Sequence, residues 1–252
     1  MNRSKVILAI FSTVLIGCGA LHYFTSNQSA SILIAASAPS LTDASSEHAN
    51  VIEDSLPRIE NVDHESSFAE RMSRRSSVKV YHPDFGGFGS GAYIKHGNRY
   101  FILTAAHVVR GEDHMLVLGR DEVVPGRVVY VNEASDIAFL EVERMNTRDP
   151  VRVRNNYNPH VSDYLVYTGF PNGTDLLTIT GRISGFRGQW LVVQGYTWMG
   201  ASGSGVFDQN GRIVGVVSMV EVGYYRGAQI IEDIVHVAKL NEEDMRKFRE
   251  AL

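Results

Sequence analysis

The sequence is poor in cysteine, with Cys18 the single example among 252 residues. One thiol excludes an internal disulfide and a cysteine-rich zinc site. Basic residues are also too few for a nucleic-acid-binding protein, since 24 Lys and Arg stand against 28 Asp and Glu, giving a net charge of -4. The nine His are scattered, and no His-Glu-x-x-His run marks a metal hydrolase. We therefore expect no metal site and no cofactor.

Long apolar runs are absent except near the N-terminus. Arg3 and Lys5 precede an almost wholly apolar stretch at 6–16, which is typical of a secretory signal or a signal anchor. Leu15-Ile16-Gly17-Cys18 resembles a bacterial lipobox, which would make Cys18 a lipidation site. The alternatives are an uncleaved anchor that continues to Phe24, or an ordinary signal peptide cleaved after Ala20. In each case residues 1–24 target the membrane, and the rest of the chain faces outward in the cell envelope.

Residues 25–75 are expected to form a flexible linker. This segment is rich in Ser and Ala and then in acidic residues, with no hydrophobic period over most of its length. At its end, Phe68–Arg75 is compatible with one short helix leading into the folded part. The folded domain is therefore predicted at 76–252.

Within this domain the pattern is that of an all-β protein. Gly, Pro, Asn and Asp separate many short apolar runs, which favours a sandwich or barrel over a parallel α/β sheet. A C-terminal helix capped by Asn241 is expected as well, with Met245 and Phe248 on one face. The predicted strands lie near 78–81, 91–94, 100–104, 115–118, 127–131, 137–142, 164–168, 176–186, 190–194, 213–219 and 228–231.

Three segments contain residue types suited to nucleophilic catalysis. Thr104-Ala105-Ala106-His107 ends an apolar strand with small residues beside an imidazole, and Asp136-Ile137-Ala138 opens another strand with a carboxylate. Gly200–Gly205 (GASGSG) is a run of small residues that permits tight turns around a serine. A serine hydroxyl needs a nearby base, and an imidazole oriented by a carboxylate is a suitable one. The order His, Asp, Ser is that of chymotrypsin-type proteases and differs from that of α/β-hydrolases.

These segments resemble the trypsin-like serine proteases of the chymotrypsin fold, in particular the bacterial HtrA/Deg group. Gly89-Ser90-Gly91 is similar to the family's first hairpin, and the stretches at 169–173 and 180–184 are similar to its mid-domain strand pair. The likeness covers about residues 77–235. It implies two six-stranded antiparallel β-barrels, followed here by the C-terminal helix.

The resemblance also implies site residues. His107 would be the general base, Asp136 its orienting carboxylate and Ser202 the nucleophile, with Ser204 as the alternative nucleophile. The backbone N–H groups of Gly200 and Ser202 would form the oxyanion hole. The substrate-binding positions would be Tyr196 at the pocket base, Ser218 on the strand that pairs with substrate, and Val220 on the pocket wall. A non-acidic pocket base favours an apolar or small residue before the cleaved bond.

Two departures from the family pattern concern the nucleophile loop. Ala201 stands where the family usually has Asp or Asn, and Gly205 stands where it usually has Pro. The loop must then be held by other contacts. The chain also ends 50 positions after Ser202, so we expect no peptide-binding PDZ domain.

The predicted function is that of a serine endopeptidase acting on protein or peptide substrates. The alternative is a catalytically inactive module that uses the same fold for binding.

Overall fold

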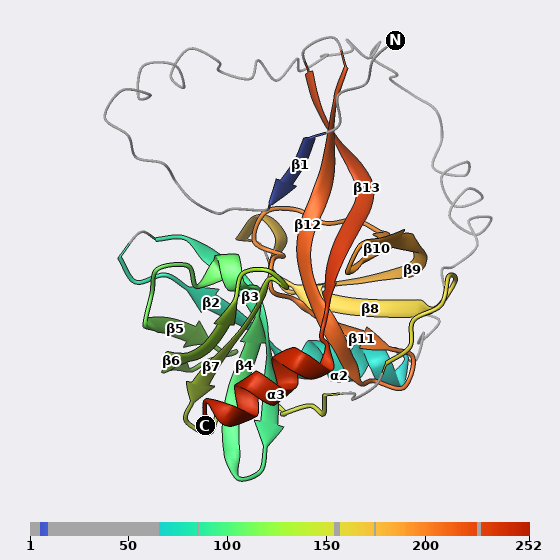
Figure 1. Ribbon diagram of the computed structural model, residues 1–252. Helices are drawn as coiled ribbons and strands as arrows, with labels where there is room; N and C mark the ends of the chain where they lie inside the picture. Colours follow the sequence, from blue (N-terminus) through green and yellow to red (C-terminus); the bar gives the residue numbers. More distant parts are fainter. Residues whose placement is uncertain (1–5, 10–65, 85, 154–156, 174, 226–227) are drawn as a thin grey trace, which may run out of the picture. The chain divides into compact units, whose positions relative to one another are not determined.

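The computed structural model describes residues 6–9, 66–84, 86–153, 157–173, 175–225 and 228–252 (Figure 1). Cys18 and most of the predicted targeting segment and linker lie outside the described residues. Of the N-terminal segment, Val6–Ala9 forms the short strand β1, antiparallel to β12. None of the helices in the described ranges combines the length and apolar character needed to cross a membrane.

Six antiparallel strands close into the first barrel in the order β2-β3-β4-β7-β6-β5. Its interior is filled by alternate side chains of these strands, among them Val78, Val80, Ile102 and Leu140. Gly91 permits close packing here, because a Cβ at that position would lie 2.4 Å from a methyl group of Ile102. The strands are β2 (Ser77–Tyr81), β3 (Phe88–His96), β4 (Arg99–Thr104), β5 (His114–Leu118), β6 (Val123–Asn132) and β7 (Ile137–Val142).

The second barrel contains the remaining strands. They pair in the order β12-β11-β8-β9-β10-β13, and pairing between β12 and β13 closes the ring, with β1 added on β12. The bounds are β8 (Tyr164–Gly169), β9 (Leu177–Arg187), β10 (Trp190–Gln194), β11 (Gly205–Asp208), β12 (Ile213–Tyr225) and β13 (Ala228–Lys239). Two closed six-stranded barrels confirm the predicted all-β, chymotrypsin-like fold.

Two helices flank the barrels. Helix α2 (Phe68–Ser76) has a capping box between Ser67 and Glu70, and its Ser73 donates a hydrogen bond to Thr168 of β8 at 2.7 Å. The helix expected near Phe68 is therefore present and packs on the second barrel. Helix α3 (Glu242–Glu250) is capped by Asn241, as expected, and lies across the first barrel (Figure 1).

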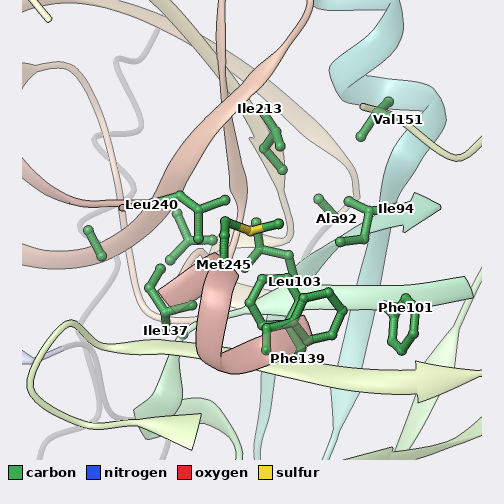
Figure 2. Close-up of a cluster of buried hydrophobic side chains, with 14 of the residues drawn as sticks. Ala92, Ile94, Phe101, Leu103, Ile137, Phe139, Val151, Ile213, Leu240 and Met245 are labelled. Carbon is green, nitrogen blue, oxygen red and sulfur yellow. The ribbon is translucent and has the colours of Figure 1, made fainter. Parts of the chain in front are cut away.

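One hydrophobic cluster joins both barrels and α3. Figure 2 shows Met245 of α3 among side chains that include Leu103 and Ile137 of the first barrel and Ile213 of the second. Phe248, one turn further along α3, stacks on Phe139 at a ring-centroid distance of 4.0 Å. Because this cluster spans the junction, the relative position of the two barrels is fixed by apolar packing.

Candidate active site

His107 follows β4 in a single 3-10 turn at Ala106–Val108. Ala105 and Ala106 are buried, and their small side chains let this turn sit against the barrel. The imidazole of His107 is itself 5% exposed. The strand end therefore holds the ring in a confined position at the junction of the barrels.

Asp136 lies in the turn before β7 and contacts both the ring and the backbone of His107. Its Oδ2 and Oδ1 atoms are 2.9 Å and 3.0 Å from the ring Nδ1, and Oδ1 also accepts a hydrogen bond from the backbone N–H of His107 at 3.0 Å. Ser218 of β12 also donates its hydroxyl to Oδ2 of Asp136. The first barrel thus supplies the His and Asp, and the second supplies a hydroxyl that binds the same carboxylate.

The segment Gly200–Gly205, called the nucleophile loop below, packs against the strands that lead to His107. The Ser202 carbonyl accepts a hydrogen bond from the Ser90 N–H at 2.7 Å. A Cβ on Gly89 would lie within 3.0 Å of both the Ser202 carbonyl oxygen and the Val108 side chain, so Ser202 and the residue after His107 meet at Gly89. Gly203 has φ +84°, and a Cβ there would lie 2.1 Å from Oγ1 of Thr104. Glycine is therefore required at both positions for this approach.

Ser204, the alternative nucleophile, faces a different part of the protein. It is fully buried, and a Cβ on Gly169 would lie 2.0 Å from its hydroxyl oxygen. Its N–H bonds to Ala201 and its carbonyl accepts from Val217. This serine thus points toward the end of β8.

The peptide bond before Gly200 has a defined orientation. The Met199 carbonyl accepts a hydrogen bond from the Asn172 N–H at 2.6 Å. In a trans peptide the N–H points opposite to the C=O, so the Gly200 N–H is directed away from Asn172. Gly200 has φ +93°, and a Cβ there would clash with the Phe170 carbonyl at 2.5 Å.

The loop is held without an Asp or Asn at position 201. Ala201 is buried, and its N–H donates to the Trp198 carbonyl at 3.0 Å. A further restraint is Ser90 of β3, whose hydroxyl donates to the Gly200 carbonyl at 2.7 Å and accepts from the Phe170 N–H at 3.0 Å. From the sequence, Gly89-Ser90-Gly91 indicates only a hairpin, and this role of the serine hydroxyl is not predicted.

The predicted pocket residues differ in their exposure. Tyr196 is 49% exposed, and its carbonyl accepts the hydroxyl of Tyr167, whose pKa is raised by burial. Val220 of β12 is buried and pairs in register with Val235 of β13. Within the described ranges, no group of three or more His, Cys, Asp or Glu side chains is arranged to hold a metal ion.

Comparison with known proteins finds serine proteases among the relatives of this chain. The chain is 27% identical over 160 residues to the "Probable periplasmic serine protease do/HhoA-like" of Haemophilus influenzae, covering 59% of this chain and 34% of that protein. It is 27% identical over 177 residues to the "Serine protease HtrA-like" of Staphylococcus epidermidis, covering 62% of this chain and 30% of that protein. The chain thus spans only about a third of the length of these relatives.

A solved structure shares the fold. The serine endoprotease from Yersinia pestis superposes with a TM-score of 0.60 at 21% identity, covering 72% of this chain and 65% of that one. In sequence, the model of the trypsin-like peptidase domain matches residues 89–216, which include His107, Asp136 and Ser202. The resemblance to HtrA-type proteases is therefore confirmed, and the chain belongs to the trypsin-like peptidase domain family.

Proposed function

We propose that this protein is a serine endopeptidase that hydrolyses peptide bonds through His107, Asp136 and Ser202. The observation that carries the proposal is the double contact of Asp136 with the ring and the backbone of His107. An ionised carboxylate only accepts hydrogen bonds, so Nδ1 of His107 donates and Nε2 is the basic nitrogen. The position of the nucleophile loop beside Gly89 and Thr104 supports Ser202 as the group that this base serves.

The reaction proceeds through an acyl-enzyme. Ser202 Oγ attacks the scissile carbonyl carbon while Nε2 of His107 takes the hydroxyl proton. Collapse of the tetrahedral intermediate breaks the C–N bond, and the imidazolium returns the proton to the leaving amine. A water molecule then repeats the sequence on the ester, which releases the acid and restores Ser202. Asp136 stabilises the imidazolium in both steps.

The oxyanion is bound by the backbone N–H groups of Gly200 and Ser202. Such donors act best when they are already oriented before the reaction, because no reorganisation is then needed as charge develops. The hydrogen bonds to the Met199, Gly200 and Ser202 carbonyls supply that orientation. Tyr196, Ser218 and Val220 would contact the acyl part of a protein or peptide substrate.

The cellular location is also part of the proposal. The basic and apolar start of the chain, with Cys18 as a lipid attachment point, supports tethering to the envelope membrane with the protease domain facing outward. One relative carries the word periplasmic in its name. Mass spectrometry of the membrane-extracted protein distinguishes a lipidated start at Cys18 from an uncleaved Met1.

The test compares Ser202→Ala with Ser204→Ala in the full chain. Hydrolysis of an unfolded protein substrate and labelling by a serine-directed phosphonate are expected to disappear in the first variant and persist in the second. Equal labelling of wild type and Ser202→Ala would overturn the assignment. A folded wild type that neither hydrolyses nor labels would favour the inactive binding module.

A further inference from the structure

A buried carboxylate on the C-terminal helix lies at the centre of a polar cluster that the proposed reaction does not use. Asp244 of α3 has no exposed surface, and a single oxygen, Oδ1, accepts three side-chain hydrogen bonds. The donors are the hydroxyl of Tyr130 at 2.8 Å, the amide of Asn132 at 2.7 Å and the hydroxyl of Ser135 at 3.0 Å. Burial and the bond to Asp244 raise the pKa of Tyr130, which keeps this phenol a donor.

Two of the three donors lie in the turn that carries Asp136 or directly before it. Asn132 ends β6, and its side chain both donates to Asp244 and accepts from the Ala134 N–H at 3.1 Å. Ser135 directly precedes Asp136 and is also buried. Helix α3 is therefore bonded to the last residue of β6 and to Ser135 in the turn that follows.

The backbone conformation of Asp136 must be held in place by its surroundings. Asp136 has φ +55°, a left-handed conformation that a non-glycine residue adopts at a cost and keeps only where its surroundings hold it. The same residue must direct its carboxylate at His107 and Ser218. Without the bonds from α3, the turn is free to relax toward an ordinary conformation and withdraw that carboxylate.

We propose that Asp244 is a positioning residue: from helix α3 it holds the turn at Asn132–Ser135 and so keeps Asp136 against His107. This inference rests on the proposed function, because it gives the C-terminal helix a part in the same catalytic site. The helix is anchored independently by Met245 (Figure 2) and by Phe248, which both belong to the hydrophobic cluster, so Asp244 is not needed merely to attach it.

A second side chain outside the turn also contacts it, and its effect must be distinguished from that of Asp244. Gln189, in the connection between β9 and β10, donates its side-chain amide to the Ala134 carbonyl. Gln189 is exposed, whereas Asp244 and Ser135 are buried. Solvent competes with the Gln189 bond, so the main restraint comes from α3.

The experiment uses four variants of the full chain: Asp244→Ala, Asp244→Asn, Ser135→Ala and Phe248→Leu. Asp244→Ala removes the acceptor, and Asp244→Asn keeps an amide oxygen in the same place. Ser135→Ala removes the donor nearest to Asp136. Phe248→Leu loosens α3 in the hydrophobic cluster without touching the turn, and it serves as the matched control for helix docking.

The first readout needs no turnover. In a Ser202→Ala background, proton NMR follows the His107 Nδ1–H resonance that reports the hydrogen bond to Asp136. We expect this resonance to be lost or broadened in Asp244→Ala and Ser135→Ala, and retained in Asp244→Asn and Phe248→Leu. The second readout is kcat per phosphonate-titrated active site, which should fall about tenfold to hundredfold in Asp244→Ala with KM changed little, because small displacements of a catalytic group have effects of this size.

The outcomes are distinct. A wild-type resonance and wild-type kcat in Asp244→Ala would overturn the inference, as would an equal loss in Phe248→Leu. If Asp244→Ala does not fold, Ser135→Ala decides by the same criteria. If the wild type shows no activity but the resonance still depends on Asp244, the proposed function fails while the positioning role stands.

Discussion

The Nδ1 atom of His107 lies 2.9 Å from Oδ2 of Asp136, although 29 positions separate the two residues in the sequence. The same carboxylate also binds the backbone N–H of His107, so it fixes both the ring and the turn that carries it. This relationship sets the tautomer on which the proposed base depends.

Replacing Asp136 with Asn tests that dependence. An amide in place of the carboxylate presents a donor as well as an acceptor and no longer stabilises an imidazolium. We expect kcat to fall by about 10⁴ with KM nearly unchanged. Steady-state kinetics on a peptide substrate measures both values, and circular dichroism checks the fold. A variant that keeps a tenth or more of the wild-type kcat would contradict the proposed role.

Removing the Ser218 hydroxyl should have a smaller effect. Ser218 donates to Oδ2 of Asp136, which also lies 2.9 Å from His107 Nδ1, so Ser218→Ala leaves the carboxylate with one donor fewer. A hydrogen bond to a charged group contributes about 1.5–3 kcal/mol, so we expect kcat to fall about tenfold to hundredfold. Ser77→Ala, which removes a buried hydroxyl bonded to Ser73 and Thr168, is the control and should leave kcat unchanged. Equal kinetics for the two variants would count against the contact.

The Ser90 hydroxyl should control the oxyanion hole. Ser90→Ala removes the bonds to the Gly200 carbonyl and the Phe170 N–H. We expect kcat to fall about tenfold to hundredfold, with weaker binding of a peptide aldehyde that mimics the tetrahedral intermediate and little change in KM. Ser77→Ala again provides the control. Unchanged aldehyde affinity in Ser90→Ala would show that the loop is held by its other contacts.

Stability should depend on pH through Glu141. Burial alone would raise the pKa of Glu141, but hydrogen bonds from Arg99 and Arg127 outweigh it and hold the pKa below the ordinary value of 4.5. A carboxyl with a lowered folded pKa stabilises the protein above its unfolded pKa and loses this contribution as the pH falls through the folded pKa.

Glu141→Gln should therefore lower the free energy of unfolding by about 1 kcal/mol at pH 7, and by less at pH 3. Urea unfolding at the two pH values measures the difference. Glu250→Gln, in an exposed pair with Arg246, is the control and should change stability little at either pH. A penalty for Glu141→Gln that is larger at pH 3 than at pH 7 would contradict a lowered pKa of Glu141 in the folded protein.

The sequence predicted the fold class and the regular strands well, and the strand ends less well. β13 was expected at 228–231 but runs to Lys239, because Glu232 and Asp233 interrupt the apolar pattern. β6 was expected from Arg127 but begins at Val123, since Pro125 disfavours a strand. The structure accommodates Pro125 where β6 pairs with β5 alone, before its pairing with β7 begins at Gly126.

The supporting residues of the site could not be predicted in the same way. His107 and Asp136 each lie in a short motif that can be recognised from a few consecutive residues. Ser90 acts on a carbonyl 110 positions away, and Asp244 acts on a hydroxyl 109 positions away. No pattern in the sequence specifies such a hydrogen-bonded pair, because the partner depends on how the barrels and α3 pack together.

The position of Ser90 makes the activity of this enzyme sensitive to small movements between the two barrels. Its strand belongs to the first barrel, while Gly200, Ser202 and Phe170 belong to loops of the second. The amides that would receive the reacting oxygen are therefore aligned by bonds that cross the seam between the halves. A small rotation of one barrel against the other would therefore reduce turnover before any unfolding is measurable. A bound ligand or a substitution could cause such a rotation even at a site far from the substrate.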